Sequence, residues 1–129
     1  MVNKRSTIYI AGHKGLVGSA IVRKLKEKGY KNLVTKTRRE LDLLDQKKVF
    51  QFIKKIKPNF IFLAAAKVGG IHHNNIKRAE FIYENLTIQN NIIHSAYKCG
   101  VKDIIFLGPC IIIPHGFVFL PQYLIPHST

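Results

Sequence analysis

The stretch that decides the fold is TIYIAGHKGLVG, residues 7–18. A β-branched and aromatic run leads into three evenly spaced glycines, Gly12, Gly15 and Gly18, and a helix pattern follows at once. The first glycine of such a turn permits the tight bend, the second lets the backbone approach a pyrophosphate, and the third lets the helix pack on the strand. Free amide groups at the start of the helix favour negative charge. The order of strand, turn and helix is therefore typical of a dinucleotide-binding βαβ unit.

The alternation of strand and helix patterns continues along the chain. Asp45 is the expected N-cap of a second helix that ends before Pro58, and the apolar run that follows reads as a strand buried on both faces. The expected elements, in order, are strand 7–11, helix 15–28, strand 32–36, helix 45–57, strand 60–66, helix 78–99 and strand 103–107. This pattern predicts an α/β fold, a Rossmann-type doubly wound parallel sheet truncated after about the fourth strand.

Composition limits the class of protein. A chain of 129 residues can hold one domain, and it has no apolar run of the roughly 18 residues that a membrane span needs, so we expect no membrane partner. Cys99 and Cys110 lack metal-ligand spacing, and no group of histidines supplies a ligand set, so no metal site is expected. Without an export signal at the start, reduced thiols in a cytoplasmic protein are the default.

The formal net charge of +14 has two interpretations. It fits a nucleic-acid-binding protein, or a lysine-rich composition laid over an ordinary enzyme. The basic residues are spread along the helices and no nucleic-acid motif accompanies them, so we expect no nucleic-acid partner. The excess charge would still steer an anionic nucleotide towards the protein.

The residues after the second strand bear on the choice of cofactor. Sites that prefer NAD usually place an acid there to accept hydrogen bonds from the ribose 2′-hydroxyl. Here the strand runs into the basic segment Lys36–Glu40, in which the Arg38 guanidinium could clamp a 2′-phosphate, and Lys14 could reach the same phosphate. The alternative is a solvated turn. This segment favours NADP over NAD.

The chain changes character after Asp103. Residues 104–129 contain no Asp, Glu, Lys or Arg, and four of the five prolines lie there: Pro109, Pro114, Pro121 and Pro126. We therefore divide the chain into an incomplete NADP-binding Rossmann domain, 1–108, and an apolar, proline-rich irregular tail, 109–129. Two interpretations remain open for the tail, an irregular segment lying across the sheet or an aberrant end from a truncation or a reading-frame change.

Longer motifs resemble those of one enzyme family. They are IAGHKGLVGSA (10–20), TRRELDLLD (37–45), LAAAKVGGI (63–71) followed by Asn74-Asn75, FIYEN (81–85), NIIHSA (91–96) and FLG (106–108). Together they resemble the GDP-L-fucose synthase family of extended short-chain dehydrogenase/reductases over about residues 5–108. The segment AAAKVGG is far more specific than the glycine turn.

The resemblance implies a cofactor site and a reaction. Enzymes of the family epimerise GDP-4-keto-6-deoxy-D-mannose at two carbons and then reduce its ketone with NADPH, so a GDP-sugar is the implied substrate. The turn would cradle the pyrophosphate, Arg38 the 2′-phosphate, residues 41–43 the adenine, and residues 64–66 and 107–108 the remainder of the cofactor. The implied cofactor-binding residues are Gly12, His13, Lys14, Gly15, Leu16, Val17, Gly18, Arg38, Leu41, Asp42, Leu43, Ala64, Ala65, Ala66, Leu107 and Gly108.

The catalytic segments of the family are not matched. Where the family has Ser-Ser-Cys-Ile-Tyr-Pro, this chain has Pro109 at the serine position and Ile111 at the cysteine position, with Cys110 one residue away. No tyrosine is followed by lysine four residues later, so the Tyr-x-x-x-Lys proton donor pair is absent. We therefore assign no catalytic residue, and the family's substrate domain is expected to be absent.

Two functional hypotheses follow from these departures. The first is a truncated epimerase/reductase that is inactive alone, and the second is a non-catalytic NADP-binding module or remnant. A sheet without its later strands has an open edge and exposed apolar surface, so we expect marginal solubility or a homodimer.

Overall fold

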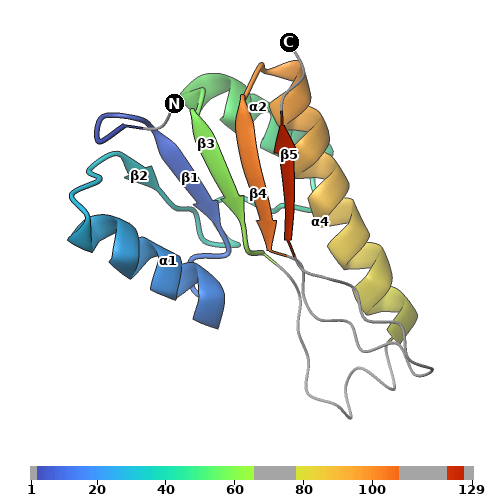
Figure 1. Cartoon of the computed structure of the whole chain (residues 1–129). Coiled ribbons are helices and arrows are strands. Elements are labelled where there is room, and N and C mark those ends of the chain that lie inside the picture. The colour runs from blue at the N-terminus through green and yellow to red at the C-terminus, as the bar shows by residue number, and fades with distance from the viewer. Residues whose placement is uncertain (1–2, 66–77, 108–121, 127–129) are drawn as a thin grey trace.

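The computed structural model describes residues 3–65, 78–107 and 122–126, which form one five-stranded sheet with three helices (Figure 1). The elements in chain order are β1 (Ile8–Ala11), α1 (Leu16–Glu27), β2 (Leu33–Val34), α2 (Gln46–Ile56), β3 (Phe60–Leu63), α4 (Arg78–Lys98), β4 (Asp103–Leu107) and β5 (Gln122–Pro126). The strand order is β2-β1-β3-β4-β5; the first four strands are parallel and β5 is antiparallel to β4.

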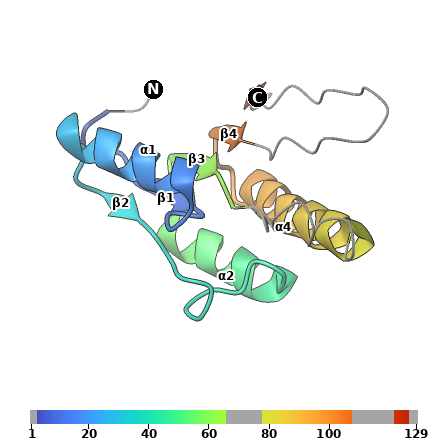
Figure 2. The ribbon, with the colours of Figure 1, turned by 90° about the horizontal axis from the view of Figure 1, so that it is seen from below.

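The helices cover opposite faces of the sheet. The step from β1 to β2 runs in one direction along the sheet, whereas the steps to β3 and β4 run in the other. Since crossovers between parallel strands are right-handed, this reversal places α1 on one face and α2 and α4 on the other (Figure 2). The reversal lies between β1 and β3, and open α/β sheets bind ligands at such a switch point, beyond the carboxyl ends of the strands.

The main core lies between the sheet and the α2–α4 layer. Alternate strand residues face these helices, and Tyr9, Ile61 and Ile104 pack with Ile53 of α2 and Ile92 of α4. The Tyr9 and Phe52 rings meet edge to face, with their centroids 5.0 Å apart. Burial raises the pKa of the Tyr9 hydroxyl well above its usual range, so the side chain is neutral in the folded protein.

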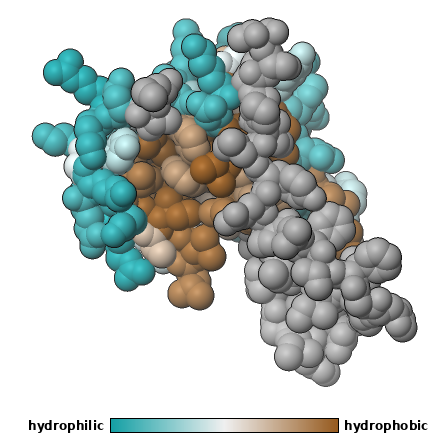
Figure 3. All heavy atoms as spheres, viewed as in Figure 1, coloured by the Kyte–Doolittle hydropathy of each residue, from teal (hydrophilic) through white to brown (hydrophobic). Residues whose placement is uncertain are grey.

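The described residues cover the opposite face of the sheet only in part. Ile8 and Ile10 are buried, and α1 contacts the strand that carries them. Further along this face, Phe60, Phe62 and Ile105 are half-buried, and the two phenylalanine rings lie 4.8 Å apart. Figure 3 looks onto this face and shows apolar residues gathered over the middle of the sheet beside the hydrophilic surface of the α1 side. In the described part of the chain, α1 is the one helix on this face.

The predicted Rossmann-type parallel sheet is confirmed, with small differences in the length of its elements. Strand β4 has the predicted bounds, β2 is shorter than expected, and β3 ends at Leu63 rather than at Ala66. Asp45 is the N-cap of α2, as predicted, and its carboxylate accepts a hydrogen bond of 3.2 Å from the Lys48 N–H.

The structure corrects one feature of the predicted tail. Residues 122–126 were expected to be irregular, because prolines flank and end this segment, but they form β5 beside β4. An edge strand needs hydrogen bonds on one side only, and Pro126 is the last residue of the strand, where a missing N–H is tolerated. The other residues of the predicted tail, 109–121 and 127–129, lie outside the described residues.

Candidate functional site

A cavity of about 270 Å³ lies at the switch point of the sheet. The last pair in the β1–β3 register is Ala11 and Leu63, so the glycine turn and the residues after β3 leave the sheet side by side. The Ala64 N–H donates a hydrogen bond of 2.9 Å to the Ala11 carbonyl and ties the two segments together. The lining residues come from the glycine turn, the loop after β2, the end of β3 and one side of α4.

Two glycines make the turn fit against its neighbours. Gly12 has a φ of +87°, and a Cβ on it would lie 2.7 Å from the backbone of Ala64. A Cβ on Gly18 would lie only 1.9 Å from the Gly12 carbonyl oxygen, which explains how closely α1 packs on the turn. A Cβ on Gly15 would meet only that same oxygen, at 3.4 Å, so packing within the protein does not demand glycine there. Gly15 lines the cavity, where its missing side chain leaves room for a ligand.

The amino end of α1 is open to an anion. Its N-cap, Gly15, supplies no side-chain acceptor, and the first turn of the helix holds no acidic residue. The amides of Leu16, Val17 and Gly18 therefore have no acceptor within the helix and lie at the positive end of the helix dipole. Helix α2 provides a contrast, because the Asp45 carboxylate caps it. The geometry fits a pyrophosphate at the start of α1.

Basic side chains gather around the same cavity. Lys14, from the glycine turn, and Arg38, from the loop after β2, both line it, together with Lys36. Lys36 Nζ lies 3.8 Å from the Glu40 carboxylate. Within the described ranges, neither Lys14 nor Arg38 forms an ion pair. Both remain available for a phosphate group.

The loop after β2 also carries the apolar part of the cavity. Leu41, Asp42 and Leu43 line it. The Asp42 carboxylate accepts a hydrogen bond of 3.0 Å from the Leu44 N–H, so it shapes the loop. The Leu43 carbonyl accepts a hydrogen bond of 2.8 Å from the buried Asn91 side chain, which fixes the loop to α4.

Other predicted site residues lie at different places. The Leu16 and Val17 side chains are 88% and 52% exposed at the start of α1, and neither residue lines the cavity. Gly18 is buried behind the turn. Leu107 is half-buried at the end of β4, outside the cavity lining. Ala64, Ala65 and His13 line the cavity, whereas Ala66 and Gly108 lie outside the described residues.

Sequence reasoning missed the contribution of α4. Glu84 and Ile88, four residues apart on one side of the helix, complete the cavity lining, with Thr37 and Leu44 from the loop. The spacing of the two α4 residues could have suggested a shared face, but only the tertiary structure brings that face to the glycine turn. The helix leaves a second cavity, of about 410 Å³, between Leu44 and Ala79–Thr87.

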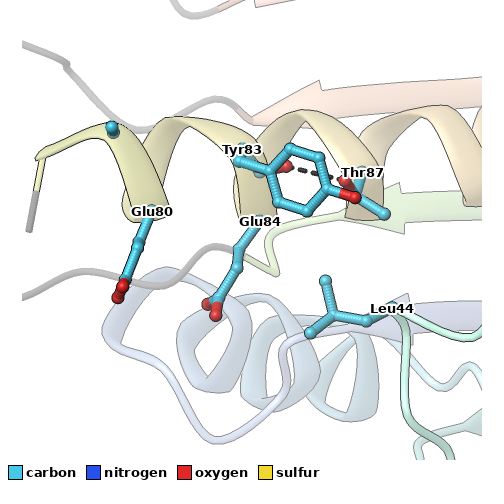
Figure 4. Close-up of a pocket in the computed structure, with 6 residues that line it drawn as sticks. Leu44, Glu80, Tyr83, Glu84 and Thr87 are labelled. Atoms are coloured by element: carbon cyan, nitrogen blue, oxygen red, sulfur yellow. Dashed lines mark hydrogen bonds between the residues drawn. The ribbon is translucent and has the colours of Figure 1, made fainter.

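Glu84 lies between the two cavities and lines both of them. Figure 4 shows Glu80 and Glu84 leaving the same side of α4, with Leu44 across the second cavity and the Thr87 hydroxyl donating to the Tyr83 carbonyl at 2.7 Å. Among the residues that the structure describes, no group of three or more potential metal ligands comes together. No described helix is long and apolar enough to span a membrane.

Comparison with known proteins finds relatives along the whole chain. GDP-L-fucose synthase 1 of Arabidopsis thaliana is 57% identical over 129 residues, a match that covers 100% of this chain and 39% of that protein. GDP-L-fucose synthase of Escherichia coli K12 is 47% identical over 110 residues, covering 85% of this chain and 34% of that protein. The chain thus spans well under half the length of these relatives, and the predicted resemblance to their N-terminal part is confirmed.

A solved structure extends the comparison to the fold. GDP-mannoheptose C4 reductase from Campylobacter jejuni with NADP bound superposes with a TM-score of 0.78 at 43% identity, covering 91% of this chain and 38% of that chain. Residues 8–121 match the family described as NAD dependent epimerase/dehydratase. The match spans the glycine turn, the loop after β2 and the predicted start of the tail, so the chain belongs to the NAD dependent epimerase/dehydratase family.

Proposed function

We propose that this chain binds NADP and is the cofactor-binding part of a GDP-L-fucose synthase-like epimerase/reductase. The observation that carries this proposal is the cavity in which the uncapped amino end of α1 and the basic residues Lys14 and Arg38 meet. A dinucleotide with a 2′-phosphate carries negative charge at two separated places, and the cavity offers positive groups at both.

Each part of the cavity has a role in this proposal. The amides at the start of α1 bind the pyrophosphate, and Arg38 with Lys14 binds the 2′-phosphate. The adenine lies against residues 41–43 and Ile88, and Ala64 and Ala65 direct the cofactor towards the end of β3. The bound cofactor supplies a hydride for the reduction of a sugar ketone.

The substrate proposed for the whole enzyme is a GDP-sugar, GDP-4-keto-6-deoxy-D-mannose, on the strength of the GDP-L-fucose synthases that share this sequence. We expect the chain alone to be inactive, because Pro109 and Ile111 replace a serine and a cysteine and no Tyr-x-x-x-Lys pair is present. The alternative is a non-catalytic NADP-binding module. NADPH oxidation in the presence of the keto-sugar and of an added C-terminal part of a GDP-L-fucose synthase separates the two, because a truncated enzyme would regain turnover and a binding module would consume no NADPH.

The test of cofactor binding is a titration of the purified chain with NADPH and NADH. We expect binding of NADPH, and Arg38→Ala should weaken it by about 10-fold or more, the cost of one charge-assisted hydrogen-bonded contact, without changing the affinity for NADH. Arg23→Ala, on α1 and outside the cavity lining, is the matched control and should change neither affinity. Absence of NADPH binding by the unsubstituted chain would reject the proposal.

We propose a second copy of the chain as a partner. Among the described side chains of α4, four large apolar ones are exposed: Ile82, Tyr83, Leu86 and Tyr97. Tyr83 also lines the second cavity. At 100° per residue, Ile82, Leu86 and Tyr97 fall within about 60° of one another. A two-fold antiparallel pairing centred near Asn90 would set Ile82 of one copy beside Tyr97 of the other. This stripe supports a homodimer through α4.

The net charge is proposed to attract anionic nucleotides rather than nucleic acid. What supports this is that three basic side chains, Lys14, Lys36 and Arg38, line the cavity. Retention on DNA that disappears at moderate salt would agree with charge acting alone, whereas retention at high salt would contradict it.

A further inference from the structure

The loop that carries Arg38 is closed by a reciprocal pair of hydrogen bonds between Thr37 and Glu40. The Thr37 N–H donates to Glu40 Oε1 at 3.0 Å, and the Glu40 N–H donates to Thr37 Oγ1 at 3.3 Å. The Thr37 carbonyl accepts from the N–H groups of Glu40 and Leu41, at 3.1 and 2.9 Å. This is the arrangement of a capping box, formed here in a turn rather than at the start of a long helix. It fixes the backbone on both sides of Arg38.

The Glu40 carboxylate is directed into the turn rather than towards the cavity. Arg38 and Thr37 line the cavity, and Glu40 does not. The Thr37 backbone N–H, followed by its hydroxyl, holds the pKa of the Glu40 carboxyl below its usual range, with smaller contributions from Lys36 and His13. Glu40 is therefore ionised at neutral pH, and one of its oxygens is occupied by the turn.

This placement bears on the choice between the two nicotinamide dinucleotides. An acid after the second strand favours NAD when its oxygens accept from the ribose 2′-hydroxyl. Here an acid stands two residues after Arg38, but its Oε1 accepts from the loop's own backbone. The same carboxylate that would repel a 2′-phosphate in an open loop instead organises the loop that presents the guanidinium.

We propose that Glu40 is a positioning residue for the 2′-phosphate, acting through Thr37 and Arg38 without touching the cofactor. The inference rests on the proposed binding of NADP. The direction of the change in affinity tests this role. An acid that merely lies near the phosphate would weaken its binding, so removal of that acid should strengthen phosphate binding. A positioning acid has the opposite effect, and its removal should weaken phosphate binding.

The experiment compares Glu40→Ala with Glu40→Gln in the full chain. Alanine removes both the charge and the acceptor of the Thr37 N–H, whereas glutamine keeps an oxygen acceptor and removes only the charge. The affinities for NADPH and NADH, and for 2′,5′-ADP and 5′-AMP, are measured by calorimetric or fluorescence titration. We expect Glu40→Ala to weaken NADPH and 2′,5′-ADP by about fivefold and to leave NADH and 5′-AMP unchanged, since loss of a cap costs on the order of 1 kcal/mol.

Glutamine should restore the affinity for the phosphorylated ligands to at least that of the unsubstituted chain. Asp45→Ala is the matched control for Glu40→Ala, because it removes one carboxylate and the cap of α2, outside the cavity lining, and should leave the NADPH-to-NADH ratio unchanged. The unchanged affinity of Glu40→Ala for 5′-AMP serves as its check on folding.

Three results would overturn the inference: Glu40→Ala binding NADPH as well as or better than the unsubstituted chain, Glu40→Ala losing NADH and NADPH equally, or glutamine failing to restore binding. Failure of the proposed function is a different result, since it appears as no binding of NADPH by the unsubstituted chain.

Discussion

At the scale of the residue, the three glycines of the turn have different reasons to be glycine. Gly12 and Gly18 are required by the protein itself, since a Cβ on either would collide with backbone atoms. Gly15 is not crowded within the protein and faces the cavity. The sequence pattern treats the three positions alike, and only their surroundings separate folding from ligand binding.

This difference predicts opposite outcomes for two alanine substitutions. Gly18→Ala should lower the free energy of unfolding by about 2 kcal/mol or more, because α1 must move away from the turn. Gly15→Ala should change it by less than about 1 kcal/mol but weaken NADPH binding, because the methyl group enters the cavity. Urea unfolding and NADPH titration measure the two effects. A Gly18→Ala protein as stable as the unsubstituted chain would contradict the close packing.

At the scale of the element, α4 combines two kinds of buried polar residue. The Asn91 side chain donates to the Leu43 carbonyl and holds the loop after β2. The Ser95 hydroxyl is buried and has no hydrogen-bond partner among the described residues. One polar group therefore stabilises the contact between helix and loop, while the other is a cost to folding.

Alanine at each position should consequently act in opposite directions. Asn91→Ala is expected to lower the free energy of unfolding by about 1–3 kcal/mol, because the Leu43 carbonyl loses its partner. Ser95→Ala should leave it unchanged or raise it by about 1 kcal/mol, since no hydrogen bond is lost. Chemical denaturation of both variants gives the comparison. Equal destabilisation by the two changes would argue against this account of α4.

The elements show how far sequence reasoning reaches. The periods of the apolar residues and the Asp45 cap located β1, β4 and α2, because these signals are local. The sequence also brought Lys14 and Arg38 into one site, since both follow strands whose ends meet. The sequence did not predict β5, because the prolines around residues 122–126 indicated an irregular segment. It also did not predict that Glu84 and Ile88 line the cavity. Their roles depend on which distant segments lie beside them.

At the scale of the whole molecule, the exposed apolar side of α4 should govern association. If two copies pair through it, Leu86→Glu places two carboxylates in the interface and should give a monomer. Leu16→Glu is the matched control, because Leu16 is equally apolar and 88% exposed but lies on α1. Sedimentation equilibrium gives the mass against 14.7 kDa for one chain. A monomeric unsubstituted chain, or dissociation by the Leu16 change, would refute the pairing.

The two faces of the sheet differ in burial, so we expect them to differ in which substitutions they tolerate. Ile61 and Phe62 are neighbours on β3, yet Ile61 is fully enclosed in the α2–α4 layer while Phe62 lies on the partly covered face. A random-mutagenesis library selected for folding should therefore accept polar residues at position 62 and reject them at position 61. The tolerance at position 61 would then be set by the core of this chain, whereas the tolerance at position 62 would be set by the more open face of the sheet.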